Sequence, residues 1–220
     1  MALLTLPLHD AFARETAAAA EVKAEASPGA ALLWEAEARC LVAPRAMSGR
    51  LRAGLAATEA RGWPCHFRST GGDVTPQGPG VVSMGLAFRQ SAKAANAIEE
   101  AYAAICAPLI AALAACGVTA GTGAVEGSYC DGAFNVTVDG LKFAGTALRM
   151  SPIPGGDWAV LGQAMFLTRA DDAAFEEAIN ALYADAGLGR RVVAGVTVSV
   201  ADLGLDARFL PALEDALSRG

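Results

Sequence analysis

Apolar and polar residues alternate along several stretches of this 220-residue chain, and the alternation predicts β-strands with one buried face. The clearest stretch is 134–138, where Phe, Val and Val are separated by single residues. Asp139-Gly140 follows at once and is typical of a tight hairpin turn, so a returning strand is predicted from Lys142 to Arg149. Further strands are predicted at residues 31–34, 39–43, 65–69, 81–88 and 158–167.

Alanine-rich or amphipathic stretches between these strands predict helices. A helix is expected at 10–26 with Asp10 as its N-cap, and another is expected to begin at Asp171 or Asp172 and to run to Gly187. Pro108 either kinks the helix predicted at 92–116 or opens a second one. The other predicted helices are 50–60 and 209–217, and residues 192–198 are interpreted as a strand or a short turn.

Adjacent strands and isolated helices, without a regular strand–helix alternation, favour an α+β (mixed α/β) fold. The linkers are short except at 70–80, where glycines and prolines gather between two predicted strands. Glycine N–H groups in such a loop can cradle an anion or a carbonyl oxygen, and the alternative interpretation is a flexible connector.

Composition and charge bear on three classes of protein: nucleic-acid-binding, membrane-spanning and secreted. A net charge of −6, a pI of about 4.9 and the lack of any lysine or arginine run disfavour a nucleic-acid-binding function. Residues 101–125 carry no charge, but prolines and glycines interrupt them, so no membrane span is expected. The amino terminus has no secretory pattern, and five cysteines without a C-x-x-C spacing favour free thiols in a cytoplasmic protein.

Cys130 and Lys142 are the sharpest candidates for chemistry. Cys130 stands among glycines and polar residues, Lys142 stands just past the hairpin turn, and a cation near a thiol favours its nucleophilic form. From the residues alone, Cys130 could also be a buried thiol and Lys142 a surface lysine. For Arg68 a surface ion pair is slightly favoured over anion binding, and Asp73 and Asp131 suit turns as well as catalysis.

Two segments resemble one known superfamily. Residues 68–80, RSTGGDVTPQGPG, resemble the lipoate-binding loop of the lipoate-protein ligase and octanoyltransferase superfamily. Residues 126–132, EGSYCDG, together with 135–136 and 141–147, resemble its second signature, in the same order along the chain. There the lysine contacts the acyl carbonyl, and in one acyltransferase branch a cysteine at this place is the nucleophile.

The resemblance implies a fold and a site. The fold is shared with biotin-protein ligases: one α+β catalytic domain over residues 1–220, with mixed or antiparallel sheets flanked by helices and 190–220 as a short carboxy-terminal extension. Cys130 and Lys142 are the implied catalytic residues, an apolar tunnel is expected for the acyl chain, and no metal ligand is implied. The implied substrate-binding residues are Arg68, Thr70, Gly71, Gly72, Asp73, Gly78, Gly80 and Gly145.

Departures from the superfamily patterns bear on which branch is implied. Many octanoyltransferases carry Tyr-His where this chain has Pro76-Gln77, and they place their cysteine later, whereas Cys130 is the last cysteine here. This favours the branch with the cysteine in the second signature, which includes octanoyl amidotransferases. ATP-using ligases usually have a third glycine where Asp73 stands, although single-domain ligases belong to the same superfamily.

Three functions follow as hypotheses. The first is an acyltransferase that moves an octanoyl or lipoyl group onto a lysine of a lipoyl-carrier domain through a Cys130 thioester, without a cofactor. The second is a lipoate-protein ligase that needs ATP and Mg²⁺ and acts through an acyl-adenylate. The third is a binding module that holds an acyl group without turnover. The expected carriers are the glycine cleavage H protein or the E2 component of a 2-oxoacid dehydrogenase.

Overall fold

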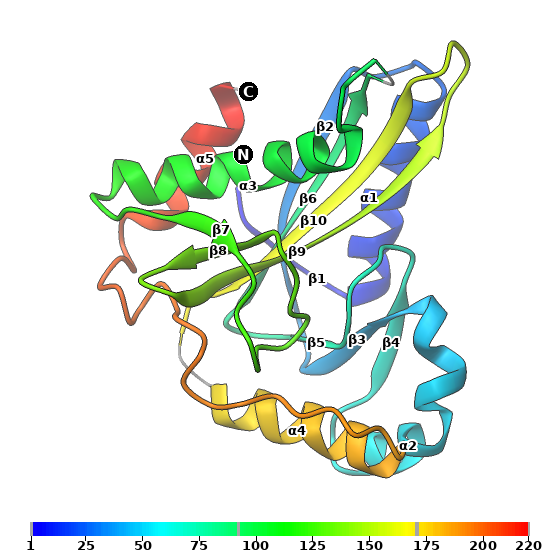
Figure 1. The fold of residues 1–220 in the computed structure, drawn as a ribbon, viewed down its shortest axis with the longest axis vertical. Coiled ribbons are helices and arrows are strands. Elements are labelled where there is room, and N and C mark those ends of the chain that lie inside the picture. Colours follow the sequence, from blue (N-terminus) through cyan, green and yellow to red (C-terminus); the bar gives the residue numbers. More distant parts are fainter. Residues whose placement is uncertain (1, 92, 170–171, 220) are drawn as a thin grey trace.

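The computed structural model describes residues 2–91, 93–169 and 172–219, and a seven-stranded sheet runs through its centre (Figure 1). The strand order is β1-β2-β6-β10-β9-β8-β7. β1 and β2 pair in parallel, and the other neighbours pair antiparallel. The strands are β1 (Leu4–Leu6), β2 (Gly29–Ala36), β6 (Val81–Gln90), β7 (Gly121–Gly123), β8 (Asn135–Val138), β9 (Leu141–Pro152) and β10 (Trp158–Leu167).

A second, smaller sheet has three strands in the order β4-β3-β5. β3 (Cys40–Pro44) pairs in parallel with β4 (Cys65–Arg68) and antiparallel with β5 (Thr75–Gln77). Both sheets therefore mix strand directions and are flanked by helices, which confirms the predicted α+β class.

Helices cover both faces of the large sheet. Leu33 packs in the core cluster of α3 (Ala97–Ala115) and α5 (Phe209–Arg219), whereas its neighbour Trp34 packs against residues of α1 (Leu8–Lys23). Because successive residues of a strand point to opposite faces, α1 lies on the face opposite to α3 and α5.

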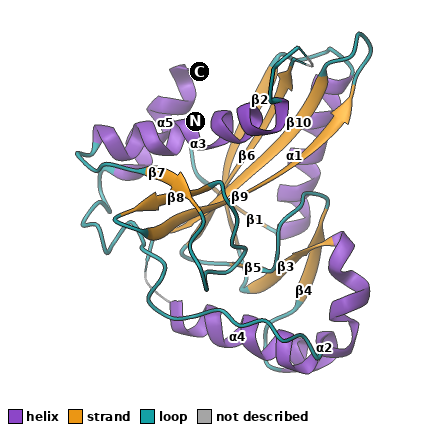
Figure 2. Cartoon of the chain, viewed as in Figure 1, coloured by secondary structure: helices purple, strands orange, loops and turns teal. Residues whose placement is uncertain are grey.

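The small sheet has a core of its own. It packs with α2 (Ser48–Ala60) and α4 (Asp172–Asp185), which contact each other, and a short 3₁₀ helix, η1 (Arg45–Met47), precedes α2. Tyr129 and Cys130 belong to this cluster although they come from the loop between β7 and β8. Figure 2 shows the segment after α4 as a long loop that runs along that helix. The two cores meet at β10, and the candidate site lies near that junction.

Several local predictions differ from the structure. Three short strands, β1, β5 and β7, were not predicted, because each has only three residues and no alternation of its own. The first helix begins at Leu8, after Pro7, rather than at Asp10. For residues 192–198 the short-turn alternative is right, with a turn at 194–195 and a single bridge to Lys142, and Asp171 lies outside the described residues.

The apolar segment at 101–115 belongs to α3, which continues through Pro108 as one helix. By length and composition α3 could cross a membrane. In the structure it packs against β9, β10 and α5. Its buried residues are Ala101, Ile105, Cys106, Leu109, Ala112 and Leu113.

Candidate active site

Cys130 lies in the loop that connects β7 to β8, and it is 8% exposed. Its backbone φ is +49°, a conformation that side-chain-bearing residues rarely adopt. Asp131 stabilises this loop, because its Oδ1 accepts hydrogen bonds from the Val125 N–H at 2.8 Å and the Asn135 Nδ2 at 3.1 Å. Asp131 therefore has a structural role as a turn residue, and the loop holds Cys130 in an uncommon backbone geometry of the kind that clusters at functional sites.

The glycine loop that follows β4 meets Cys130 directly. The Asp73 backbone N–H donates a hydrogen bond to Cys130 Sγ at 3.1 Å. Gly72 has a φ of +95°, and a Cβ atom built there would lie 2.7 Å from Cys130 Sγ and 2.9 Å from Arg68 Nη2. Only glycine fits between these atoms, so the fold brings the two signature segments together around Gly72.

Lys142 is fully buried at the start of β9, beside the loop between β7 and β8 that carries Cys130. Its Nζ donates hydrogen bonds to the carbonyl oxygens of Cys130, at 3.1 Å, and of Tyr129, and it lies 4.6 Å from the centre of the Tyr129 ring. Burial lowers the pKa of Lys142 to about 8, although the negative charges of Cys130 and Asp131 oppose this shift. The surface-lysine alternative is thereby wrong.

Gly145 faces the same ammonium group, since a Cβ there would lie 3.0 Å from Lys142 Nζ. Gly145 also lines the cavity next to Cys130, so it belongs to the site geometrically.

Arg68, at the end of β4, is 6% exposed, which makes the favoured surface ion pair wrong. Its guanidinium donates to backbone carbonyls of Val42 at 3.0 Å, Asp73 at 2.8 Å and Gly71 at 2.9 Å. Burial lowers the pKa of Arg68, while negative charge on Cys130 and Glu15 opposes that shift. A cation is therefore held inside the protein beside the thiol.

The Asp73 side chain ties the glycine loop to α4 and the segment after it. Its Oδ1 accepts hydrogen bonds from the Val74 N–H at 2.8 Å and the Tyr183 hydroxyl at 2.7 Å, and Arg190 forms an ion pair with Oδ2. The backbone N–H of Asp73 that faces Cys130 is thus positioned from three sides.

The segment after α4 also forms backbone hydrogen bonds with Lys142. The Lys142 N–H donates to the Val196 carbonyl and its carbonyl accepts from the Val198 N–H, both at 2.9 Å. The predicted carboxy-terminal extension accordingly includes residues that brace the site.

Three of the other cysteines are poorly suited to nucleophilic attack. Burial raises the pKa of Cys40 to about 12 and the pKa values of Cys65 and Cys106 to about 11. Each of these thiols is therefore protonated at neutral pH and a poor nucleophile.

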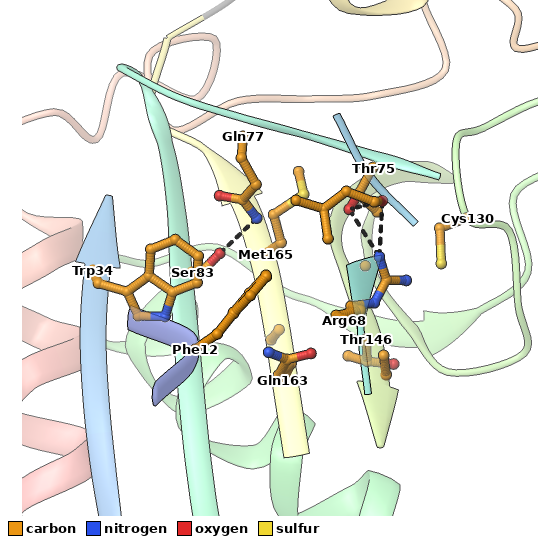
Figure 3. A pocket seen from close by; sticks show the side chains of 14 residues that line it. Phe12, Trp34, Arg68, Thr75, Gln77, Ser83, Cys130, Thr146, Gln163 and Met165 are labelled. Atoms are coloured by element: carbon orange, nitrogen blue, oxygen red, sulfur yellow. Dashed lines mark hydrogen bonds between the residues drawn. The ribbon is translucent and has the colours of Figure 1, made fainter. Parts of the chain in front are cut away.

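A cavity of about 30 Å³ opens beside Cys130, which is room for roughly one water molecule. Figure 3 shows Cys130 at one end of the lining residues and Trp34 and Ser83 at the other. The wall is formed mainly by apolar atoms, as expected for an acyl chain, but the space is too small for an octanoyl tunnel. The lining residues include Phe12, Trp34, Arg68, Thr75, Gln77, Ser83, Gln163 and Met165.

A buried carboxylate stands behind the cavity wall and was not predicted from the sequence. Glu15 of α1 accepts hydrogen bonds from Trp34 Nε1 at 2.8 Å and from Gln163 Nε2. Gln163 Oε1 in turn accepts from the Thr70 hydroxyl, which ties the network to the glycine loop. Burial raises the pKa of Glu15 to about 7, against the hydrogen bonds from Trp34 and Gln163 and the charge of Arg68.

Two implied substrate-binding glycines lie away from Cys130. A Cβ atom at Gly78 would meet Arg39 at 2.8 Å, and the Gly80 N–H donates to Glu35 Oε2 at 2.7 Å. Neither glycine lines the cavity, whereas Thr70 and Gly71 contact residues that do. The glycine loop thus divides into a part at the thiol and a part that shapes the turn before β6.

The sequence matches the lipoyl protein ligase A/B catalytic domain over residues 7–205. Octanoyl-GcvH:protein N-octanoyltransferase from Kyrpidia tusciae is 37% identical over 142 residues, which cover 64% of this chain and 48% of that protein. The same enzyme from Geobacillus kaustophilus is 33% identical over 122 residues, covering 56% of this chain and 41% of that protein. The chain thus spans about half or less of the length of each of these two relatives.

An uncharacterised protein from Cupriavidus necator is 31% identical over 210 residues, covering 86% of this chain and 83% of its own length. Among solved structures, lipoate-protein ligase A bound with ATP superimposes with a TM-score of 0.62 at 14% identity, covering 98% of this chain and 85% of that one. The bi-partite lipoate protein ligase from Thermoplasma acidophilum gives a TM-score of 0.59 at 15% identity, covering 98% and 83%. At these identities the structures show a common fold.

Proposed function

This chain belongs to the lipoyl protein ligase A/B catalytic-domain family, and from that premise we propose that it is an acyltransferase that works through a thioester on Cys130. The acyl group is octanoyl or lipoyl, and the acceptor is a lysine of a lipoyl-carrier domain. The octanoyltransferase relatives support this reaction class, and their name supports a glycine cleavage H protein as one carrier. The bi-partite ligase from Thermoplasma acidophilum is described together with its E2 lipoyl domain, which supports a carrier of that type as well.

One observation carries the proposal: the Asp73 N–H, the Arg68 guanidinium and the Lys142 ammonium converge on the loop that carries Cys130. A positive guanidinium and a backbone N–H beside a sulfur atom stabilise its thiolate form, which is the nucleophile. Cys130 is the cysteine of the chain that these groups surround.

In the first step the Cys130 thiolate attacks the carbonyl carbon of the acylated donor lysine. A carbon–sulfur bond forms, and the negative charge moves to the carbonyl oxygen, where Lys142 stabilises it. The tetrahedral intermediate then collapses, the carbon–nitrogen bond breaks, and the departing lysine amine takes one proton from Lys142. The product is an acyl thioester on Cys130 and a neutral Lys142.

In the second step the amine of the acceptor lysine attacks the thioester carbonyl. The new carbon–nitrogen bond forms, the carbon–sulfur bond breaks, and Cys130 leaves as a thiolate. The proton lost from the attacking nitrogen returns to Lys142, which restores both catalytic groups. A lysine pKa of about 8 suits this exchange, because the group both gives and takes a proton near neutral pH.

The test is a transfer assay with an octanoylated H-protein-type donor and an unmodified E2-type lipoyl domain, without nucleotide. We expect the octanoyl group to appear on the acceptor by mass spectrometry, and Cys130→Ala to abolish its appearance. Cys106→Ala is the matched control, because it removes another buried thiol and should leave transfer intact.

Two other results would assign a different function. Loading of free octanoate that requires ATP and Mg²⁺ and survives Cys130→Ala would establish the ligase. Binding of octanoate with no transfer under either condition would establish a binding module.

A further inference from the structure

Glu15 is a buried carboxylate that the reaction described above does not use. It lies on α1, is 3% exposed, and contacts the side chains of Trp34 on β2 and Gln163 on β10. Both partners line the cavity beside Cys130 (Figure 3). Gln163 also contacts the hydroxyl of Thr70, which belongs to the glycine loop. A chain of hydrogen bonds therefore connects Glu15 to the loop that meets the thiol.

The large sheet leaves room for this carboxylate at Gly85. Gly85 lies on β6, between Leu32 of β2 and Gln163 of β10. A Cβ atom built there would lie 2.8 Å from Glu15 Cγ and 2.9 Å from its Cδ, so a side chain at this position would displace the carboxylate. The absence of a side chain at Gly85 thus lets Glu15 reach Gln163.

The direction of each hydrogen bond in this chain depends on whether Glu15 is ionised. The Trp34 N–H can only donate, so Glu15 Oε1 accepts in both protonation states. An ionised Oε2 also accepts, which requires Gln163 to turn its amide nitrogen to Glu15 and its oxygen to the Thr70 hydroxyl, as in the structure. A protonated Oε2 donates instead. Gln163 must then turn its oxygen to Glu15 and its nitrogen to Thr70, which becomes an acceptor.

The two arrangements hold the glycine loop with different strength. When Glu15 is ionised, the bonds from Trp34 and Gln163 are charge-assisted, and such bonds are about twice as strong as bonds between neutral groups. When Glu15 is protonated, every bond of the chain joins neutral groups. Burial raises the pKa of Glu15 to about 7, so both forms are populated near neutral pH.

The charged group that acts on Glu15 from another element is Arg68 of β4. Its positive charge opposes the rise in the Glu15 pKa, as do the hydrogen bonds from Trp34 and Gln163. The neighbours of Glu15 on β2, β6 and β10 are Trp34, Gly85 and Gln163, which carry no charge. On α1 itself, the exposed Arg14 lines a small cleft together with Glu15.

We propose that Glu15 is a positioning residue: in its ionised form it orients Gln163 to accept from Thr70, and this holds the glycine loop in the geometry at which Cys130 reacts fastest. Thr70 stands three residues before Asp73, whose N–H contacts Cys130 Sγ. Glu15 does not line the cavity beside the thiol, so it acts through Gln163 and Thr70. The inference rests on the proposed function, because the rate concerned is that of thioester formation.

The test uses Glu15→Gln, which keeps every hydrogen bond of the chain but fixes the directions of the protonated form. Native protein and variant are mixed with S-octanoyl-N-acetylcysteamine between about pH 5.5 and about pH 8.5. The donor's carbon–sulfur bond breaks as the bond to Cys130 Sγ forms, N-acetylcysteamine leaves and takes a proton from water, and mass spectrometry follows the adduct. The ultraviolet absorbance of the thiolate corrects each rate for ionisation of Cys130.

We expect the native protein to react roughly five- to tenfold faster than Glu15→Gln above about pH 8, because its chain contains charge-assisted bonds. The ratio of the two rates should approach one below about pH 6, with its midpoint near the Glu15 pKa of about 7. A ratio that does not change with pH would overturn the proposal.

Thr70→Val tests the other end of the chain, because it removes the hydroxyl and keeps the shape of the side chain. It should slow octanoylation above about pH 8, and Thr70→Ser should restore the rate. In the Thr70→Val background, Glu15→Gln should have little further effect, since the connection is already broken. Fully additive effects in the double variant would contradict a connection through Gln163.

Gly85→Ala displaces the carboxylate without changing a group of the chain, and it serves as the second variant if Glu15→Gln does not fold. It should also remove the native pH dependence. Gly162→Ala is its matched control, because a Cβ atom there would lie 2.5 Å from Ile105 Cγ1, in the core of α3 and α5. This variant overpacks the sheet as well, but it should keep the native pH dependence. Its loss there would attribute the effect to overpacking.

A second readout separates this inference from the proposed function. The NMR signals of the Gln163 side-chain amide and the Trp34 indole N–H should shift near pH 7 in the native protein and not in Glu15→Gln. A protein that forms no adduct at any pH loses the thioester mechanism, and alkylation of Cys130 by iodoacetamide then measures thiol reactivity, with the same ratio expected. Adduct formation with a constant ratio keeps the mechanism and loses the inference.

Discussion

The large-sheet core and the junction between the two sheets differ in what they bury. The cluster between the large sheet and helices α3 and α5 consists of apolar side chains, with three phenylalanine rings at its centre. The region where the two sheets meet buries Arg68 and Lys142 at 6% and 0% exposure, and Glu15 at 3%. Removing an ion from water costs several kcal/mol unless hydrogen bonds compensate, so the second region gives up stability that the first does not.

The difference indicates where function lies. Arg68 and Lys142 are buried cations beside the loop that carries Cys130, and burial lowers both of their pKa values. Shifted pKa values cluster at functional sites. Substitutions should therefore act differently in the two regions: through stability in the apolar core, and through activity at the junction.

The largest expected effect on stability is that of Phe209→Ala in α5. Phe209 is fully buried and packs edge-on against Phe143 at 5.1 Å and Phe166 at 5.2 Å between ring centres. We expect the free energy of unfolding to fall by about 3–5 kcal/mol, measured by urea denaturation. Ile98→Ala is the control: Ile98 is 56% exposed and should change stability by less than about 0.5 kcal/mol. Similar effects at both sites would refute the described packing of α5.

Lys142→Met should lower activity strongly and stability little, which is the reverse of the effect expected for Phe209→Ala. The variant removes the charge that stabilises the oxyanion, and we expect acyl transfer to fall by roughly 10²–10³-fold in a single-turnover assay. The free energy of unfolding should change by less than about 2 kcal/mol, because two effects oppose each other. The variant leaves two carbonyl oxygens without a hydrogen bond, but it also removes the energetic cost of burying an ammonium group. A variant that unfolds while the folded fraction keeps full activity would assign Lys142 to structure alone.

Glu15→Gln should change how stability depends on pH. The pKa of Glu15 is raised from 4.5 to about 7 in the folded protein, so folding favours its protonated form. Its contribution to stability is complete below pH 4.5 and is lost as the pH rises through about 7, by an amount on the order of 3 kcal/mol. Urea denaturation at pH 5 and pH 8 should show this loss in the native protein and a smaller loss in Glu15→Gln. An identical loss in the variant would exclude Glu15 as its source.

Arg190→Ala should have the smallest effect. The ion pair with Asp73 is half-exposed on the arginine side, and such pairs contribute about 0–1 kcal/mol. We expect a stability change within this range and a reduction of transfer by a few-fold, because the Asp73 N–H beside Cys130 becomes less firmly held. Arg190→Lys should restore most of the activity. If neither variant alters the rate, Asp73 is positioned by Tyr183 and Val74 without help from Arg190.

Elements whose own residues carry a strong turn or alternation pattern were predicted correctly from the sequence. The hairpin around Asp139-Gly140 and the long strands at 81–88 and 158–167 are present, since their turn residues and alternation are local signals. The resemblance also identified the segments that meet at Cys130. Their contact became visible only in the structure, where Asp73 and Cys130 approach across many intervening residues.

What the sequence missed depends on distant partners. Glu15 stands in an alanine-rich helix, where no local signal distinguishes it from a surface carboxylate; its role comes from Trp34 and Gln163, which reach it from two strands. The same reason applies to Arg190, whose partner Asp73 lies far away in the chain. The contact between Gln77 and Ser83 was hidden as well, because the two residues meet only when β5 and β6 are placed side by side.

The most direct test of the thioester at Cys130 is intact-protein mass spectrometry after mixing with an octanoylated carrier domain, without nucleotide. We predict an octanoyl adduct on the native protein that hydroxylamine removes, and no adduct on Cys130→Ala. An unmodified native protein under conditions where the carrier loses its octanoyl group would contradict the thioester route, as would an adduct that persists in Cys130→Ala.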